Sequence, residues 1–193
     1  MKSLETYCYK IAENDCPSDT ELRLASSDLN VKTWIFGNKE NQTSFCLDNI
    51  NWDRIYFIRH KGAAVGSLKY YLNGTGPYDE SLGKFIRFYG YSVGVVRFLT
   101  NYIFIRVFVK PQSYIYHVGV NRELRGKGLG LQLLSAIKNE LVDKNISCVY
   151  FDIRKGNSAS NNVFNKCFSS FVICAKRSLL RRFIKYKVLL IDK

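Results

Sequence analysis

The sequence predicts a mixed α/β domain in which a mostly antiparallel central sheet is flanked by helices. Two β-prone runs joined by Lys61-Gly62 predict a hairpin in the first half. In the second half, β-prone runs alternate with segments of helical periodicity. With 193 residues, 47% of them hydrophobic, and no linker or low-complexity tract, residues 1–193 are expected to form a single domain.

The first elements are short. Leu4 to Ile11 is the first predicted strand, and the polar cluster at 13–17 ends it. Ser18 followed by Glu21 three positions later is typical of a helix start with a capping serine. Two short helices are expected between there and Ile50.

The predicted hairpin occupies the middle of the chain. Its strands are Arg54–Arg59 and Ala63–Tyr71, and the turn-forming residues Asn73–Pro77 end it. Ser81–Val109 is aromatic and basic; its first part is expected to be helical, and its pattern assigns no structure to the rest.

The second half reads β–loop–α–β–α–β–β. The four strands are expected at Tyr114–Val120, Val149–Ile153, Phe171–Cys174 and Phe183–Leu190. The first helix follows Gly126–Gly130 and carries apolar residues at three- and four-residue steps, namely Leu133, Leu134, Ile137 and Leu141. The second spans Asn157–Lys166, with Val163 and Phe164 facing inward.

The net charge of +13 favours an anionic partner, although the same excess also serves solubility. No nucleic-acid-binding module is recognisable, so nucleic acid is not the expected partner. Six cysteines without a C-x-x-C pair are expected to be free thiols. The two histidines, His60 and His117, are far apart, and no metal site is expected.

The N-terminus lacks the apolar run of a signal peptide, and charged residues interrupt the most lipid-like stretch, 89–109. We therefore expect a soluble, cytoplasmic protein, either a monomer or a homodimer.

A strand, a glycine-rich turn and a helix together form a phosphate site, because the first helical turn presents unpaired N–H groups to an anion. Arg125 and Lys127 add full positive charges beside the turn. The spacing excludes a P-loop, because Lys127 is followed by Gly128 and position 121 is not glycine. It also excludes a dinucleotide fingerprint, because position 131 is leucine.

The spacing that does fit is R-x-x-G-x-G at Arg125, Gly128 and Gly130. Here the chain resembles the GNAT superfamily of N-acetyltransferases, with the resemblance specific over about Ser113–Phe171. It implies a GNAT-like sheet that splays between the strands on either side of the coenzyme A-binding helix. It also implies acetyl-coenzyme A as acyl donor and an amine as acceptor, with direct attack of the unprotonated amine on the thioester and no covalent enzyme intermediate.

The resemblance assigns coenzyme-binding residues. The pyrophosphate would lie on the turn, and the pantetheine arm would lie along the edge of the preceding strand. The arm would also contact the start of the second helix, Asn157–Lys166. The residues so assigned are Val118, Gly119, Val120, Arg125, Gly126, Lys127, Gly128, Leu129, Gly130, Asn157, Ser160 and Phe164.

The catalytic residues are less clear. Phe164 stands where the family often has a proton-donating tyrosine. Strand alternation places Tyr114 and Tyr116 on the face that looks into the acceptor pocket in this family, and His117 on the other face. A β-bulge would turn His117 toward the pocket instead. Tyr114, Tyr116 and His117 are the catalytic candidates, each with the alternative of a core or pocket-wall role.

The predicted function is acetyl-coenzyme A-dependent N-acetyl transfer to a primary amine. Polyamines, aminoglycosides, amino sugars, amino acids and protein amines all remain open as acceptors. The rival hypotheses are a non-catalytic acyl-coenzyme A-binding module, favoured by Phe164, and a nucleic-acid-binding protein, favoured only by the charge.

Overall fold

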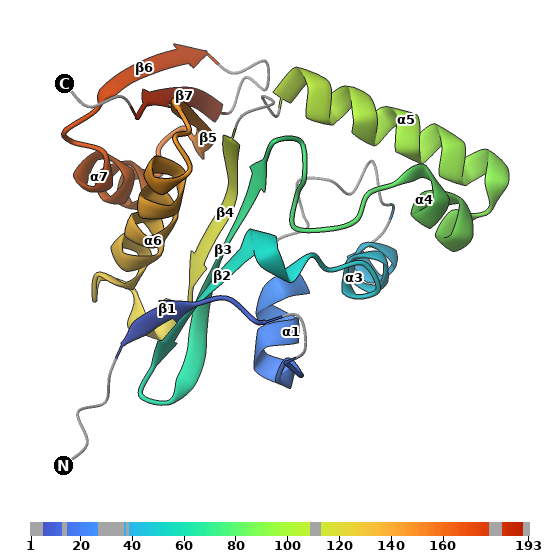
Figure 1. Ribbon diagram of the computed structural model, residues 1–193, viewed down its shortest axis with the longest axis horizontal. Helices are drawn as coiled ribbons and strands as arrows, with labels where there is room; N and C mark the ends of the chain where they lie inside the picture. The colour runs from blue at the N-terminus through green and yellow to red at the C-terminus, as the bar shows by residue number, and fades with distance from the viewer. Residues whose placement is uncertain are drawn as a thin grey trace.

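In a computed structural model, the chain folds around one seven-stranded sheet with the strand order β1-β2-β3-β4-β5-β7-β6 (Figure 1). The residues described are 6–12, 15–26, 37, 39–108, 113–177 and 183–190. All neighbouring strands are antiparallel except β4 and β5. The mixed, mostly antiparallel sheet predicted from the sequence is confirmed.

The first elements are β1 (Tyr7–Tyr9), α1 (Asp19–Ser26) and α3 (Lys39–Leu47). The predicted capping interaction at the start of α1 is present. The Ser18 amide donates to Glu21 Oε2 at 2.8 Å, and the Glu21 amide donates back to Ser18 Oγ at 3.4 Å. Glu21 also accepts from the Tyr9 hydroxyl, which ties α1 to β1.

The hairpin consists of β2 (Ile55–His60) and β3 (Ala63–Leu72), preceded by the 3₁₀ turn η2 (Trp52–Arg54). Two helices then follow, α4 (Leu82–Tyr89) and α5 (Tyr91–Phe108). The helix expected in the first part of 81–109 is present, and a second helix continues to Phe108 after a break at Gly90. The chain turns there with Gly90 at φ = 79°, a conformation that glycine adopts at little cost.

The second half matches its predicted order. The elements are β4 (Ser113–Val120), η3 (Arg122–Leu124), α6 (Leu129–Asp143), β5 (Cys148–Arg154), α7 (Ser158–Cys167), β6 (Val172–Arg177) and β7 (Phe183–Leu189). The last strand lies between β5 and β6 rather than at the edge.

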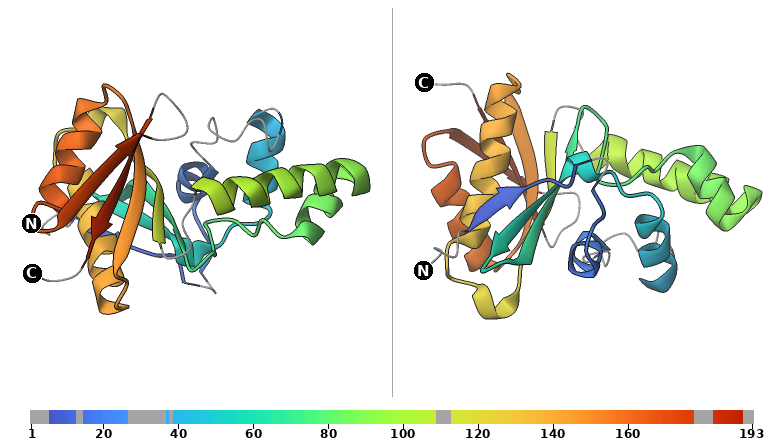
Figure 2. Two further views of the ribbon diagram at one scale, coloured as in Figure 1. Left: turned by 90° about the horizontal axis from the view of Figure 1, so that it is seen from above. Right: turned by 60° about the horizontal axis from the view of Figure 1, so that its bottom comes forward.

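The helices cover the two faces of the sheet unequally. Figures 1 and 2 show α6 and α7 on one face, and α1, α3 and the α4–α5 hairpin on the other, with α5 extending away from the sheet. The main core lies under α6, where the predicted inward residues are buried, namely Leu133, Leu134, Ile137 and Leu141. A second, aromatic core joins α3 and α4 to the opposite face through Phe45, Phe85, Tyr71 and Tyr114.

A polar cluster links α6 to the first strands. Glu140 accepts hydrogen bonds from Lys10 at 2.8 Å, from Tyr56 at 2.7 Å and from Tyr70 at 2.9 Å, and it pairs with Lys144 at 2.6 Å. These donors outweigh the effect of burial and lower the pKa of Glu140 to about 2.

Three cysteines are buried, Cys46, Cys148 and Cys167, and in the described residues Cys8 and Cys16 are also free thiols. Among the described residues, no helix is long and apolar enough to cross a membrane. The same residues contain no group of three or more histidine, cysteine or acidic side chains placed to hold a metal ion.

Candidate active site

The sheet opens between β4 and β5. These two parallel strands share only two register pairs, Tyr114 with Tyr150 and Ile115 with Phe151. Beyond Ile115, the described part of the chain pairs β4 only with β3, so no described strand covers the other edge of Val118–Val120. An exposed strand edge presents backbone N–H and C=O groups that can pair with an extended ligand. The splay implied by the family resemblance is therefore present.

The open edge of β4 leads directly to the glycine turn. Gly126 and Gly128 have φ of 81° and 79°, and Gly128 is the residue that caps the N-terminus of α6. A Cβ added at either glycine would meet no heavy atom within 4 Å. The turn therefore has open space in front of its backbone, as close approach of an anion requires.

Two basic residues flank this space and are exposed, Arg125 and Lys127. Arg125 Nε lies 3.5 Å from the Val120 carbonyl oxygen, which holds its side chain near the end of β4. The residues predicted to hold a pyrophosphate are thus gathered at one helix N-terminus, with positive charge beside them.

A β-bulge in β4 sits where the sheet opens. Lys69 of β3 pairs with His117, and the next residue, Tyr70, pairs with Ile115, so Tyr116 is the extra residue. Strict alternation predicted that His117 faces the same side as Ile115, and this was wrong.

The contacts show how the bulge redirects the side chains. Val118 and Val120 pack against the core under α6, so Gly119 faces the opposite side. A Cβ at Gly119 would lie 2.5 Å from His117 Nε2, so the imidazole lies on that opposite side too. Tyr114 and Tyr116 belong to the aromatic core on this face. The three catalytic candidates therefore share one face of the sheet.

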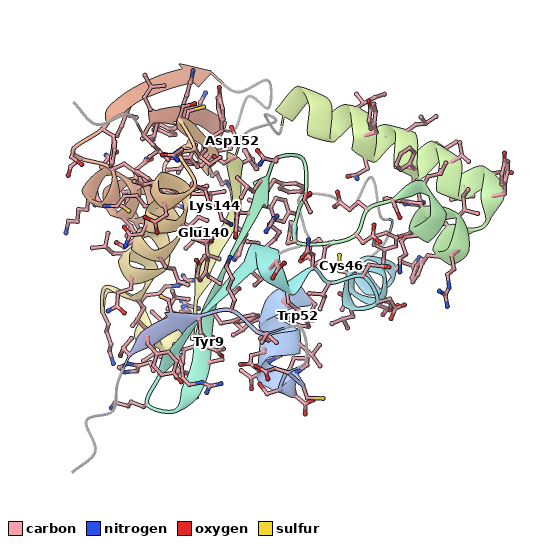
Figure 3. All side chains as sticks on the ribbon, viewed as in Figure 1. Tyr9, Cys46, Trp52, Glu140, Lys144 and Asp152 are labelled. Atoms are coloured by element: carbon pink, nitrogen blue, oxygen red, sulfur yellow. The ribbon has the colours of Figure 1, made fainter. Side chains whose placement is uncertain are left out.

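Two carboxylates join them, and sequence reasoning missed both. Asp152 is the first residue of β5 after the strands separate, and its Oδ2 accepts from the Tyr114 hydroxyl at 2.9 Å (Figure 3). Glu80 accepts from the Tyr71 hydroxyl at 3.2 Å and from Asn101 Nδ2 at 2.9 Å. Burial, with Asp152 nearby, raises the pKa of Tyr114 well above its usual value, so this phenol is a hydrogen-bond donor rather than a base.

A sequence signal for Asp152 existed. It is the one charged residue in Val149–Ile153, and it stands at the alternate position that faces away from the α6 core. Lys69 carries the same signal on β3, where it is fully buried opposite His117.

Comparison with known proteins decides the family. Residues 23–168 match the sequence profile described as "Acetyltransferase (GNAT) family". The chain belongs to the GNAT family of acetyltransferases. No curated protein sequence is similar enough to this chain to count as a match.

Solved structures show the same fold at low identity. One is diaminobutyrate acetyltransferase from Paenibacillus lautus in complex with L-2,4-diaminobutyric acid and coenzyme A. It has a TM-score of 0.57 and 12% identity, with 99% of each chain covered. A chain of the NatC complex bound to Gag peptide and coenzyme A has a TM-score of 0.52 at 13% identity, covering 98% of this chain and 99% of that one. IAA acetyltransferase from Bacillus cereus has a TM-score of 0.50 at 12% identity, covering 96% and 99%.

The remaining GNAT positions lie on α7. Asn157 caps this helix, its Oδ1 accepting from the Ser160 amide at 3.1 Å, so both residues have a structural role. Phe164 is 8% exposed and stacks on Phe151 with 4.1 Å between ring centroids. Its ring fills the core under β5, which explains why phenylalanine is tolerated where the family often has tyrosine.

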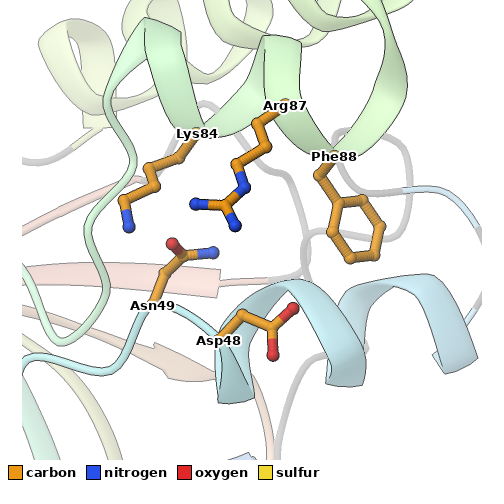
Figure 4. A pocket seen from close by; sticks show the side chains of 5 residues that line it. All are labelled: Asp48, Asn49, Lys84, Arg87 and Phe88. Carbon is orange, nitrogen blue, oxygen red and sulfur yellow. The ribbon is translucent and has the colours of Figure 1, made fainter.

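A separate cavity of about 500 Å³ lies between α3 and α4 (Figure 4). Its lining carries both signs of charge and one aromatic ring, from Asp48, Asn49, Lys84, Arg87 and Phe88. None of the predicted site residues lines it.

Proposed function

We propose that this GNAT protein transfers the acetyl group of acetyl-coenzyme A to a primary amine by direct attack on the thioester. The observation that supports it most is the continuity of the site: beyond the bulge, the edge of β4 that no described strand covers, at Val118–Val120, leads to the glycine turn. A ligand with a diphosphate at one end and an amide-bearing arm at the other fits such a path.

In this proposal the backbone amides of Arg125–Gly130 bind the pyrophosphate, aided by the dipole of α6. The amides of the pantetheine arm pair with Val118–Val120, as an added strand would. Asn157 and Ser160 contact the arm from the start of α7. The thioester then lies beside the bulge, where Tyr116 and His117 face the acceptor.

His117 is the proposed proton acceptor. The amine nitrogen forms a bond to the thioester carbonyl carbon, the carbon–sulfur bond breaks, and the sulfur leaves as the coenzyme thiolate. The proton released from the amine passes to the imidazole, directly or through water. Tyr116 is the proposed donor or relay of a proton to the thiolate. The ordinary thiol pKa of about 8.5 makes the thiolate a tolerable leaving group without a dedicated acid.

The second candidate function is binding of acyl-coenzyme A without turnover. It is favoured by Phe164, which places no hydroxyl where the family often has one. Both candidates share the coenzyme site and differ only in whether acetyl transfer follows.

Release of free thiol from acetyl-coenzyme A separates them. Purified protein is assayed with a panel of polyamines, aminoglycosides, amino sugars, diamino acids and peptide N-termini. Transfer to any of them supports the enzyme, whereas tight coenzyme binding without release for the whole panel supports the binder.

The two histidines then provide a matched pair of variants. His117→Asn should lower kcat/KM by about 10²-fold or more at unchanged coenzyme affinity, because general base catalysis contributes on that order. His60→Asn, at the far end of β2, should leave turnover unchanged. Equal activity of the two variants would exclude His117 as the base.

A further inference from the structure

In its described part, helix α5 packs on the molecule through one side and exposes apolar side chains on the other. The covered side contains Gly94, Phe98 and Asn101, which are spaced by four and then three residues along the helix. A Cβ at Gly94 would lie 2.6 Å from the Phe85 carbonyl oxygen of α4, Phe98 packs in the aromatic core, and Asn101 binds Glu80. This side joins α5 to the rest of the molecule.

The other side is exposed. Val93, Val96, Leu99 and Ile103 follow the same three- and four-residue spacing half a turn away, with Val96 63% and Ile103 60% exposed. Two tyrosines flank this apolar stripe, Tyr91 at 76% and Tyr102 at 45%. A helix that is apolar all round is normally covered all round, so this stripe is unusual for a surface in water.

All charged residues of the α4–α5 hairpin are basic. Between Ser81 and Arg122 the sequence contains no aspartate or glutamate, while Lys84, Arg87, Arg97 and Arg106 lie within α4 and α5. Lys84 and Arg87 line the cavity beside α3, where their side chains point toward Asn49 (Figure 4), and Arg97 lies over the Tyr89 ring at 4.7 Å. The hairpin that carries the stripe therefore has no negative charge of its own, on a chain of net charge +13, and an anionic partner would complement this charge.

A second copy of the chain is a poor occupant. A two-fold contact through α5 would bring two hairpins of the same positive sign together, and each chain carries +13 overall. An apolar stripe with tyrosines beside it, on a hairpin whose charged residues are all basic, instead has the chemistry of a helix that lies on an anionic bilayer.

We propose that the exposed side of α5 docks on the surface of a bilayer rich in anionic lipids. The stripe enters the boundary between headgroups and acyl chains, the two tyrosines lie at headgroup level, and the net positive charge of the chain attracts it to the lipid phosphates.

Co-sedimentation of the full chain with vesicles tests this. Binding is measured to phosphatidylcholine vesicles and to vesicles that also contain phosphatidylglycerol, at low and at high salt. We expect binding only to the anionic vesicles, weakened by salt. No binding to either, or equal binding to both, would overturn the proposal.

Two valine variants give the matched control. Val96→Glu and Val142→Glu each place one negative charge at an exposed valine on a helix, but Val142, 39% exposed, lies on α6 across the sheet. Val96→Glu should weaken vesicle binding about tenfold or more while Val142→Glu retains it. Equal losses would contradict the proposal. A different result would also contradict it: a protein that is dimeric by light scattering, becomes monomeric with Val96→Glu and does not bind vesicles. The stripe would then be an interface between copies of the chain.

Discussion

The glycine turn allows the coenzyme site to be tested apart from the stability of the fold. Gly128 has φ = 79° and caps α6, and the space in front of it is open. A valine there would strain the backbone as well as block the ligand, so alanine is the cleaner substitution. Gly74 provides a control, because its φ of 81° and its open surroundings match those of Gly128. It lies in the turn after β3, at the end of that strand away from the glycine turn.

The magnitudes follow from this geometry. An alanine in the left-handed region costs about 1 kcal/mol, so Gly128→Ala and Gly74→Ala should each lower Tm by about 2–4 °C. Acetyl-coenzyme A at about 100 times its Kd stabilises the wild type by about 2.7 kcal/mol. If the methyl group of Gly128→Ala weakens binding tenfold, the same ligand concentration contributes only about 1.4 kcal/mol.

Thermal melts of the three proteins with and without acetyl-coenzyme A measure these shifts. Gly74→Ala should keep the full ligand-induced rise in Tm, and Gly128→Ala should keep about half of it or less. A full rise in Gly128→Ala would refute the placement of the pyrophosphate at this turn. A reduced rise in both variants would show that strain alone, and not the site, weakens binding.

Two further predictions concern the core beside the site. Phe164→Tyr should change kcat by less than about tenfold, or 1.4 kcal/mol, because proton donation to the thiolate does not depend on this buried position. A larger gain in kcat, measured by steady-state kinetics, would identify position 164 as the missing proton-donor site. Glu140→Gln should lower the free energy of unfolding by about 2 kcal/mol at neutral pH, whereas Asp143→Asn, an exposed acid on the same helix, should change it little. The pKa of Glu140 is about 2 in the folded protein, against an ordinary value of 4.5. The wild type should therefore lose the stability that ionised Glu140 contributes as pH falls from about 4.5 toward 2. Denaturant titrations that show no such loss would contradict this role of Glu140.

The elements of the second half could be predicted because their patterns are local. The spacing of the α6 leucines, the glycine turn and the short β-prone runs each specify a structure within a few residues. The capping pair Ser18–Glu21 was predicted on the same grounds and is present. The helical extent of α5 was not predictable in this way, because a helix that is apolar on both sides shows no amphipathic period.

The polar partners on the face proposed to bind the acceptor come from distant parts of the chain. Asp152 meets Tyr114 across the β4–β5 junction, and Glu80 meets Tyr71 and Asn101. Single strands reveal which residues face away from the core, but not which strand or helix lies over them. Asp152 could therefore have been marked as facing the site, whereas its bond to Tyr114 required the strand order.

The position of His117 depends on a single extra residue. With regular alternation His117 would pack under α6, and Val118 and Val120 would change faces with Gly119. Because Tyr116 is inserted into the β3–β4 ladder, the valines reach the core and the imidazole reaches the opposite face. The bulge also lies where β5 leaves β4, so the local increase in twist that accompanies a bulge acts at the point of separation. One irregularity thus combines two features of the proposed mechanism: it places the His117 imidazole on the face proposed to bind the acceptor, and it lies at the start of the strand edge proposed to bind the coenzyme arm.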